Sequence, residues 1–142
     1  MTPKQVMLVK QSWQTVQPLG DAVAELFYAR LFELEPSLRA MFKNDMRSQG
    51  RMLTSVINLA VSKLDQLPAL VPALHALGAR HVGYGVRDEH YGIVGAALLD
   101  TLALGLKDAF TPEVKEAWTV TYTILADTMQ AGAAQAPVKR AA

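Results

Sequence analysis

Hydrophobic positions recur at helical spacing from the start of the chain. The first apolar side chains that share one helical face are Val6, Val9, Trp13 and Val16. Their spacing is that of an amphipathic helix rather than of an alternating strand. Thr2 followed by Pro3 supplies an N-cap and a first-turn proline, and Pro18 ends the pattern. The sequence therefore predicts a helix from Pro3 to about Pro18.

The same periodicity continues to near the C-terminus. We expect further helices over residues 21–34, 47–64, 67–82, 88–106 and 112–131, and a short helical turn over 36–42. Pro68 and Pro72 are expected to confine the regular part of 67–82 to its second half. No alternating strand pattern and no hairpin turn signal appears. The prediction is an all-α domain over residues 1–132, followed by a flexible tail over 133–142.

Composition narrows the class of protein. The 142 residues are 51% hydrophobic and 19% charged, with a net charge of +1, which argues against a disordered chain and against a nucleic-acid surface. The sequence contains no cysteine, so disulfides, thiolate metal sites, thiol nucleophiles and covalent thioether attachment of haem are excluded. No apolar run is long enough to span a bilayer, and the N-terminus lacks the apolar core of a signal peptide. We therefore expect no membrane contact and a cytoplasmic location.

Few residues have side chains and spacings that point to catalysis or ligand binding. The chain has no Gly-x-Ser-x-Gly elbow, no phosphate-binding loop and no Glu-x-x-His pair, which disfavours hydrolases, nucleotide enzymes and di-iron bundles. Three polar side chains fall on predicted apolar faces: His81, Tyr28 and Gln49. His75 and His90 are expected at the surface. Taken alone, each of the three inward-facing groups is more simply a hydrogen-bonded core residue than a ligand.

Together, however, these residues and their spacing resemble the globin family, and within it the bacterial single-domain globins that are similar to the haem domain of flavohaemoglobins. The segments that carry the resemblance are residues 26–32, 36–42, Gln49 with Leu53, 80–86, 90–95, and Ala117-Trp118 with Tyr122. They span roughly residues 3–131, almost the whole chain. The resemblance implies a globin fold with six major helices and one short helix enclosing a haem.

The resemblance also implies roles for individual residues on the proximal side. His81 would bind the haem iron, and the haem would be a non-covalent haem b. Further haem contacts are expected at Leu77, Arg80, Tyr84 and Val86. Arg80 would pair with a propionate, although a solvated surface arginine is an equal alternative.

Phe42 would wedge against the porphyrin, and Leu53 would shape the side on which the ligand binds. Tyr28 and Gln49 would donate hydrogen bonds to dioxygen, which carries partial negative charge when bound. Because an amide binds iron poorly, the sixth iron position should be open in the ferrous, ligand-free state.

Two departures from flavohaemoglobins matter for function. The sequence given ends at Ala142, so we expect no flavin- and nicotinamide-binding reductase in it. On the proximal side, Tyr91 matches the tyrosine that lies behind the proximal histidine, but Ala133 stands where a glutamate is expected. Without that carboxylate, peroxidase-like activation of oxygen is disfavoured.

Several functions remain open at this stage. The leading one is reversible dioxygen binding by a monomer, with carbon monoxide and nitric oxide as further ligands. The alternative is nitric oxide dioxygenation to nitrate with a separate reductase. A gas-sensing globin is a third possibility, and a cofactor-free helical adaptor a remote fourth.

Overall fold

Six α-helices make up most of the protein in this computed structural model, which describes residues 1–42 and 45–134. They are α1 (Pro3–Val16), α2 (Asp21–Leu34), α3 (Met46–Ser62), α4 (Leu67–Gly83), α5 (Asp88–Leu106) and α6 (Pro112–Ala134). A short 3-10 helix, η2 (Pro36–Met41), follows α2 where the sequence predicts a helical turn. Single 3-10 turns lie at Gln17–Leu19, Leu64–Gln66 and Lys107–Ala109. These ranges contain no strand, so the predicted all-α class and its division into six major helices and one short helix are confirmed.

Local capping explains where several helices begin. The Thr2 hydroxyl accepts the Gln5 backbone N–H at 3.1 Å, and the Gln5 side chain accepts the Thr2 N–H at 2.9 Å. The Thr111 hydroxyl likewise accepts the Val114 N–H at 3.2 Å at the start of α6. Both starts were predicted from these residues. Asp45 caps α3 by accepting the Ser48 N–H at 3.2 Å.

Two element boundaries differ from the prediction. Helix α4 is regular from Leu67 onward, with Pro72 inside it. Pro72 removes one hydrogen bond to Pro68, and both prolines are exposed, so water can reach the free carbonyl group. Helix α6 continues to Ala134 instead of ending near residue 131, and Gly132 is buried in it. The predicted tail residues 135–142 lie outside the described residues.

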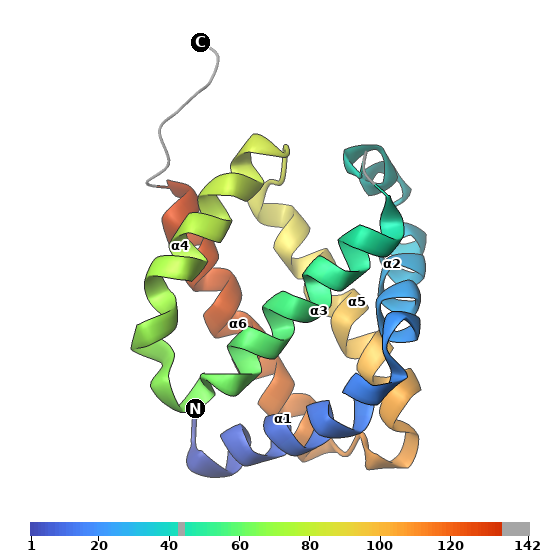
Figure 1. Cartoon of the computed structure of the whole chain (residues 1–142), viewed down its shortest axis with the longest axis vertical. Coiled ribbons are helices and arrows are strands. Elements are labelled where there is room, and N and C mark those ends of the chain that lie inside the picture. Colours follow the sequence, from blue (N-terminus) through green and yellow to red (C-terminus); the bar gives the residue numbers. More distant parts are fainter. Residues whose placement is uncertain (43–44, 135–142) are drawn as a thin grey trace.

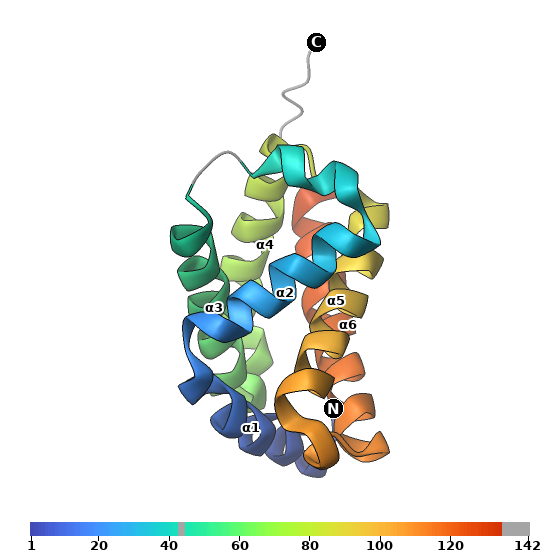
Figure 2. The same cartoon turned by 90° about the vertical axis from the view of Figure 1, so that its right-hand side faces the viewer.

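The helices surround a central region from several directions. Figures 1 and 2 show α3 on one side of the molecule and α5 with α6 on the opposite side. Helix α2 crosses between these sides and packs on both α5 and α3, while α4 packs on α6. Helices α3 and α4 are not among the closely packed pairs in the described part of the chain.

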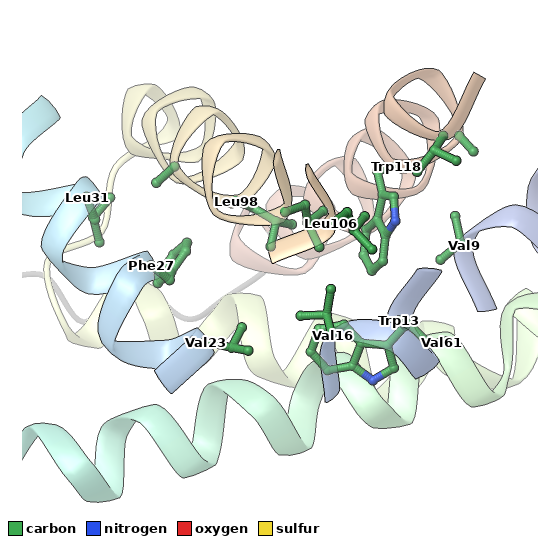
Figure 3. Close-up of a cluster of buried hydrophobic side chains, with 14 of the residues drawn as sticks. Val9, Trp13, Val16, Val23, Phe27, Leu31, Val61, Leu98, Leu106 and Trp118 are labelled. Atoms are coloured by element: carbon green, nitrogen blue, oxygen red, sulfur yellow. The ribbon is translucent and has the colours of Figure 1, made fainter. Parts of the chain in front are cut away.

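The main core lies where α1, α2, α5 and α6 meet (Figure 3). Val9, Trp13 and Val16 are buried there, which confirms the predicted apolar face of the first helix. Trp13 and Trp118 meet edge to face with ring centroids 6.1 Å apart. The Trp118 indole N–H donates to the Ser12 hydroxyl at 2.8 Å, so the one polar atom of this buried ring is paired. Within residues 1–42 and 45–134, no helix is both long and apolar enough to cross a membrane.

Candidate functional site

His81 lies in the last turn of α4 and is half-buried. Its Nδ1 atom lies 2.8 Å from the carbonyl oxygen of Leu77, so the Nδ1–H donates there and the Nε2 lone pair stays free. Burial lowers the pKa of His81, the hydrogen bond to Leu77 opposes this, and the positive charge of Arg80 adds to the lowering. The side chain is therefore a neutral imidazole near pH 7, which is the form that binds a metal ion.

The chain turns sharply after His81 and brings several predicted site residues around it. The His81 carbonyl accepts the Tyr84 N–H at 3.0 Å and the Val86 N–H at 3.1 Å. Gly85 between them has a φ of 91°, a conformation that favours glycine. The Tyr84 ring lies 5.5 Å from the His81 ring and is 56% exposed. Leu77 and Val86 are half-buried, and Arg80 is exposed.

Tyr28 lies on α2 and is 7% exposed, which confirms that it faces inward. Its ring packs on three phenylalanines. Among them is Phe42, at 5.3 Å between centroids, so the structure brings together the predicted ligand donor and a predicted porphyrin contact. Burial raises the pKa of Tyr28, and the neighbouring side chain of Gln49 opposes the rise. The phenol is thus protonated near neutral pH and available as a donor.

Helix α3 presents Gln49 and Leu53, one turn apart and both half-buried. Leu53 packs against the core cluster, whereas Val56, one turn further along, is 37% exposed. Helix α3 packs on α2 and α1 and is not among the closely packed partners of α4 in the described part of the chain.

The donor set fits a haem. The described residues contain no group of three or more His, Asp or Glu side chains that could hold a metal ion alone. A porphyrin supplies four nitrogen ligands itself and needs one neutral imidazole from the protein, which His81 offers through Nε2. The aromatic ring of Phe42 and the apolar side chains of Leu53 and Val56 on α3 suit its flat, apolar surface.

The predicted residues fall into two groups at the same end of the molecule. In the first group, Tyr28 lies on α2, Phe42 directly follows η2, and Gln49 lies at the start of α3. In the second group, His81 lies in the last turn of α4 and Tyr84 directly follows that helix. In Figures 1 and 2, the start of α3 and the end of α4 both lie in the upper half of the molecule.

Tyr91 is buried at the start of α5. Its carbonyl accepts the Tyr122 hydroxyl at 2.6 Å, and burial together with the negative charge of Asp88 raises the pKa of the Tyr91 phenol. The group within hydrogen-bond distance of the Nδ1 of His81, which Tyr91 was predicted to lie behind, is the carbonyl oxygen of Leu77.

Two predictions about the other histidines are wrong. His90 is 5% exposed instead of lying at the surface, because its Nδ1 accepts the Arg87 backbone N–H at 3.0 Å and the ring folds back over the start of α5. His75 is half-buried, because α6 crosses α4 there with Gly132 against the His75 backbone.

Phe32 was not among the predicted site residues. Its ring stacks on Tyr28 at 6.0 Å and meets Phe42 at 5.4 Å. Its position one helical turn after Tyr28 was the available signal, since residues four apart share a helix face.

Comparisons with known proteins identify the family of the chain. The family model described as Globin matches residues 25–129. A flavohemoprotein of Vibrio cholerae is 33% identical over 89% of this chain, and an anaerobic nitrite reductase of Oryza sativa is 31% identical over 84% of this chain and 86% of its own length. The chain spans about a third of the length of the flavohemoproteins, since the match covers 33% of the Vibrio protein.

Solved structures give the same result. An engineered carbene transferase made from a candidate nitric oxide dioxygenase of Rhodothermus marinus superposes with a TM-score of 0.84 at 27% identity, covering 95% of this chain and 94% of that chain. A bacterial globin of Campylobacter jejuni superposes with a TM-score of 0.83 at 26% identity, covering 94% of this chain and 97% of that chain. The chain therefore belongs to the globin family, and this membership implies haem binding.

Proposed function

We propose that this protein is a haem b globin that binds dioxygen reversibly, with His81 as the proximal ligand. The bound haem supplies a ferrous iron to which dioxygen attaches. The neutral imidazole with a free Nε2 supports the role of His81. The absence of cysteine supports non-covalent attachment, held by apolar contacts from Phe42, Leu53, Leu77, Tyr84 and Val86 and by Arg80 near a propionate.

The observation that carries the oxygen-binding proposal is the buried Tyr28 phenol beside Gln49. Bound dioxygen carries partial negative charge, so an O–H or N–H donor in a dry pocket holds it against release. Burial keeps the Tyr28 hydroxyl protonated, and its packing on Phe32 and Phe42 fixes the ring. Tyr28 would be the main donor, and Gln49 would assist it.

Nitric oxide dioxygenation is the second candidate, favoured by the similarity to flavohemoproteins and to the Rhodothermus protein. In this reaction nitric oxide and dioxygen combine with one electron to give nitrate. The electron would come from a separate reductase. The same Tyr28 and Gln49 donors would hold dioxygen for both functions.

One experiment separates the two functions. In one sample the oxygenated protein is mixed with a dioxygen scavenger, to measure release. In a second sample it is mixed with nitric oxide, excess dioxygen and a reductase system. Clean release to the ferrous state with only a single round of nitrate formation supports the carrier. Sustained nitrate production over many turnovers would mean that the function is nitric oxide dioxygenation and not oxygen carriage. Failure to form an oxygenated species would contradict both functions.

A further inference from the structure

Tyr28, Phe32 and Phe42 form a closed triangle of aromatic rings. The Phe32 ring stacks on the Tyr28 ring, with centroids 6.0 Å apart and ring planes at 29°. The Phe42 ring meets both of them edge to face, with centroids 5.3 Å from Tyr28 and 5.4 Å from Phe32. Each ring therefore restrains the other two, and any movement of Phe32 weakens the support of Tyr28.

Arg39 lies on η2 and makes contact with one ring of this triangle. Its guanidinium carbon, Cζ, lies 5.3 Å from the centroid of the Phe32 ring, which is within the range of a cation–π contact. Arg39 is exposed and Phe32 is half-buried, so the charged group keeps its contact with water while it covers part of the ring. In the described part of the chain Arg39 makes no ion pair with a carboxylate. The Phe32 ring is therefore the partner that the structure shows for its charge.

This contact joins two elements of the fold. Phe32 lies on α2, four residues after Tyr28, and Arg39 lies on η2, three residues before Phe42. The guanidinium restricts rotation of the Phe32 side chain and helps to hold η2 on α2, on which η2 packs. Phe32 in turn stacks on the ring whose hydroxyl we propose as the main dioxygen donor. Arg39 is thus linked to Tyr28 through one intermediate ring.

We propose that Arg39 is a positioning residue that holds the Tyr28 hydroxyl in its donor orientation, acting through the Phe32 ring. The inference rests on the proposed function. Without the guanidinium the Phe32 ring gains freedom, Tyr28 loses part of its support, and the hydroxyl spends less time in the donor orientation. A hydrogen bond that forms for a smaller fraction of the time holds dioxygen less well. Carbon monoxide develops less negative charge, so Arg39 favours dioxygen over carbon monoxide.

A direct effect of the positive charge on bound dioxygen is the alternative, and it predicts a different pattern. A direct effect needs the charge of Arg39 and does not need the Phe32 ring, so it persists when that ring is replaced. The positioning role needs both the Phe32 ring and the Tyr28 hydroxyl. Removing either of them should therefore abolish the effect of Arg39.

The test uses Arg39→Gln in the haem-loaded protein, with Arg39→Lys as the conservative variant and Arg47→Gln as the matched control. Arg47 is an exposed arginine at the start of α3, and among the described residues no aromatic ring forms a cation–π contact with it. Stopped-flow displacement gives the dioxygen dissociation rate, and ligand exchange gives that of carbon monoxide. Arg39→Gln is also combined with Phe32→Leu and with Tyr28→Phe, which gives two double-mutant cycles. NMR of the carbon monoxide complex measures how fast the Tyr28 ring flips.

A cation–π contact at an exposed position changes an equilibrium by a factor of about two to five. Arg39→Gln should therefore speed dioxygen release by roughly that factor, speed carbon monoxide release less, and make Tyr28 ring flipping faster. Arg39→Lys should keep most of the effect of the cation, and Arg47→Gln should behave as the unmodified protein. In Phe32→Leu and in Tyr28→Phe, adding Arg39→Gln should change dioxygen release no further.

Three results would overturn the positioning role: an unchanged dioxygen rate in Arg39→Gln, an equal effect on both gases, or a full effect of Arg39→Gln in the Phe32→Leu protein. In each case Tyr28→Phe would still speed dioxygen release, so the distal donor assignment would stand. Failure of Tyr28→Phe itself to speed dioxygen release would overturn the donor assignment, and the role of Arg39 with it.

Discussion

At the scale of single residues, His81 depends on burial and one hydrogen bond. The Leu77 carbonyl accepts the Nδ1–H of His81 and so orients the ring. Replacing the ring removes the one imidazole that we assign to the iron. His81→Ala should lose most haem on purification, measured as the ratio of Soret to protein absorbance. His75→Ala is the control, because it removes a half-buried imidazole of the same helix. Normal haem content and an unchanged ferrous spectrum in His81→Ala would refute the assignment.

Tyr28 can be tested by removing one oxygen atom. Tyr28→Phe keeps the ring that packs on Phe32 and Phe42 and deletes the hydroxyl. A hydrogen bond to a charged acceptor contributes about 1.5–3 kcal/mol, so dioxygen dissociation should accelerate by roughly 10- to 150-fold. Stopped-flow displacement measures this rate. Carbon monoxide, which develops less negative charge, should respond less, and equal responses of both gases would mean that Tyr28 acts sterically.

Single residues were predictable where the signal was local. Tyr28, Gln49 and His81 stood out because each is a polar group on an apolar helical face. The burial of His90 was not predictable, because its ring turns back to the Arg87 N–H and helical periodicity does not describe that contact. The burial of Ser12 was not predictable either, because its hydroxyl accepts a hydrogen bond from Trp118 on a helix far away in the sequence.

At the scale of elements, α4 is held by a close crossing with α6. A Cβ on Gly78 would collide with the Met129 backbone, and a Cβ on Gly132 would collide with the His75 backbone. Because backbone cannot give way as a flexible side chain does, Gly132→Ala must push the two helices apart. Overpacking of this kind costs about 1–3 kcal/mol.

Denaturant unfolding of Gly132→Ala should therefore show a lower midpoint, and haem loss should be faster because α4 carries His81. Gly92→Ala is the matched control: this glycine lies inside α5 with open space around its Cα. There the added methyl should stabilise by up to about 1 kcal/mol through helix propensity. Equal stability of the two variants would contradict the crossing as described.

Element boundaries were predictable at capped starts and not at the crossing. Thr2 and Thr111 mark helix starts through local hydrogen bonds that the sequence alone reveals. The end of α6 was predicted too early because Gly132 and its alanine neighbours read as a fraying tail. In the structure, that same glycine lets α6 pack on α4, so a tertiary contact extends the helix.

At the scale of the whole molecule, the arrangement of helices followed from pattern and resemblance, but the distances between helices did not. Periodicity predicted the all-α fold, and the order of the matching segments predicted its globin topology. The tight contact of α3 with α2 depends on Gly50, where an added Cβ would lie 2.7 Å from the Cβ of Ala24, and this is a distance between helices and not a property of either one. Sequence periodicity identifies which faces turn inward and leaves their separation undetermined.

The proximal side brings together α4, α5 and α6, and Ala133 tests what they do jointly. In the structure, the Nδ1–H of His81 meets a neutral carbonyl oxygen, and Ala133 is a half-buried residue of α6. A carboxylate hydrogen-bonded through to the imidazole would make the ring more anionic and push electron density onto iron. We therefore expect an iron–histidine stretching frequency of ordinary globin character in the ferrous protein, and weak peroxidase activity.

Ala133→Glu should raise that stretching frequency if the new carboxylate reaches the proximal hydrogen bonds, whereas Ala134→Glu should not. Ala134 is the matched control, because it is the next residue of the same helix and is exposed. Resonance Raman spectra of the ferrous proteins make the comparison. A peroxidase-like frequency in the unmodified protein would show that a group other than residue 133 increases the electron density that His81 donates to the iron. The unmodified protein could then activate oxygen, and an enzymatic function would replace the proposed reversible oxygen binding.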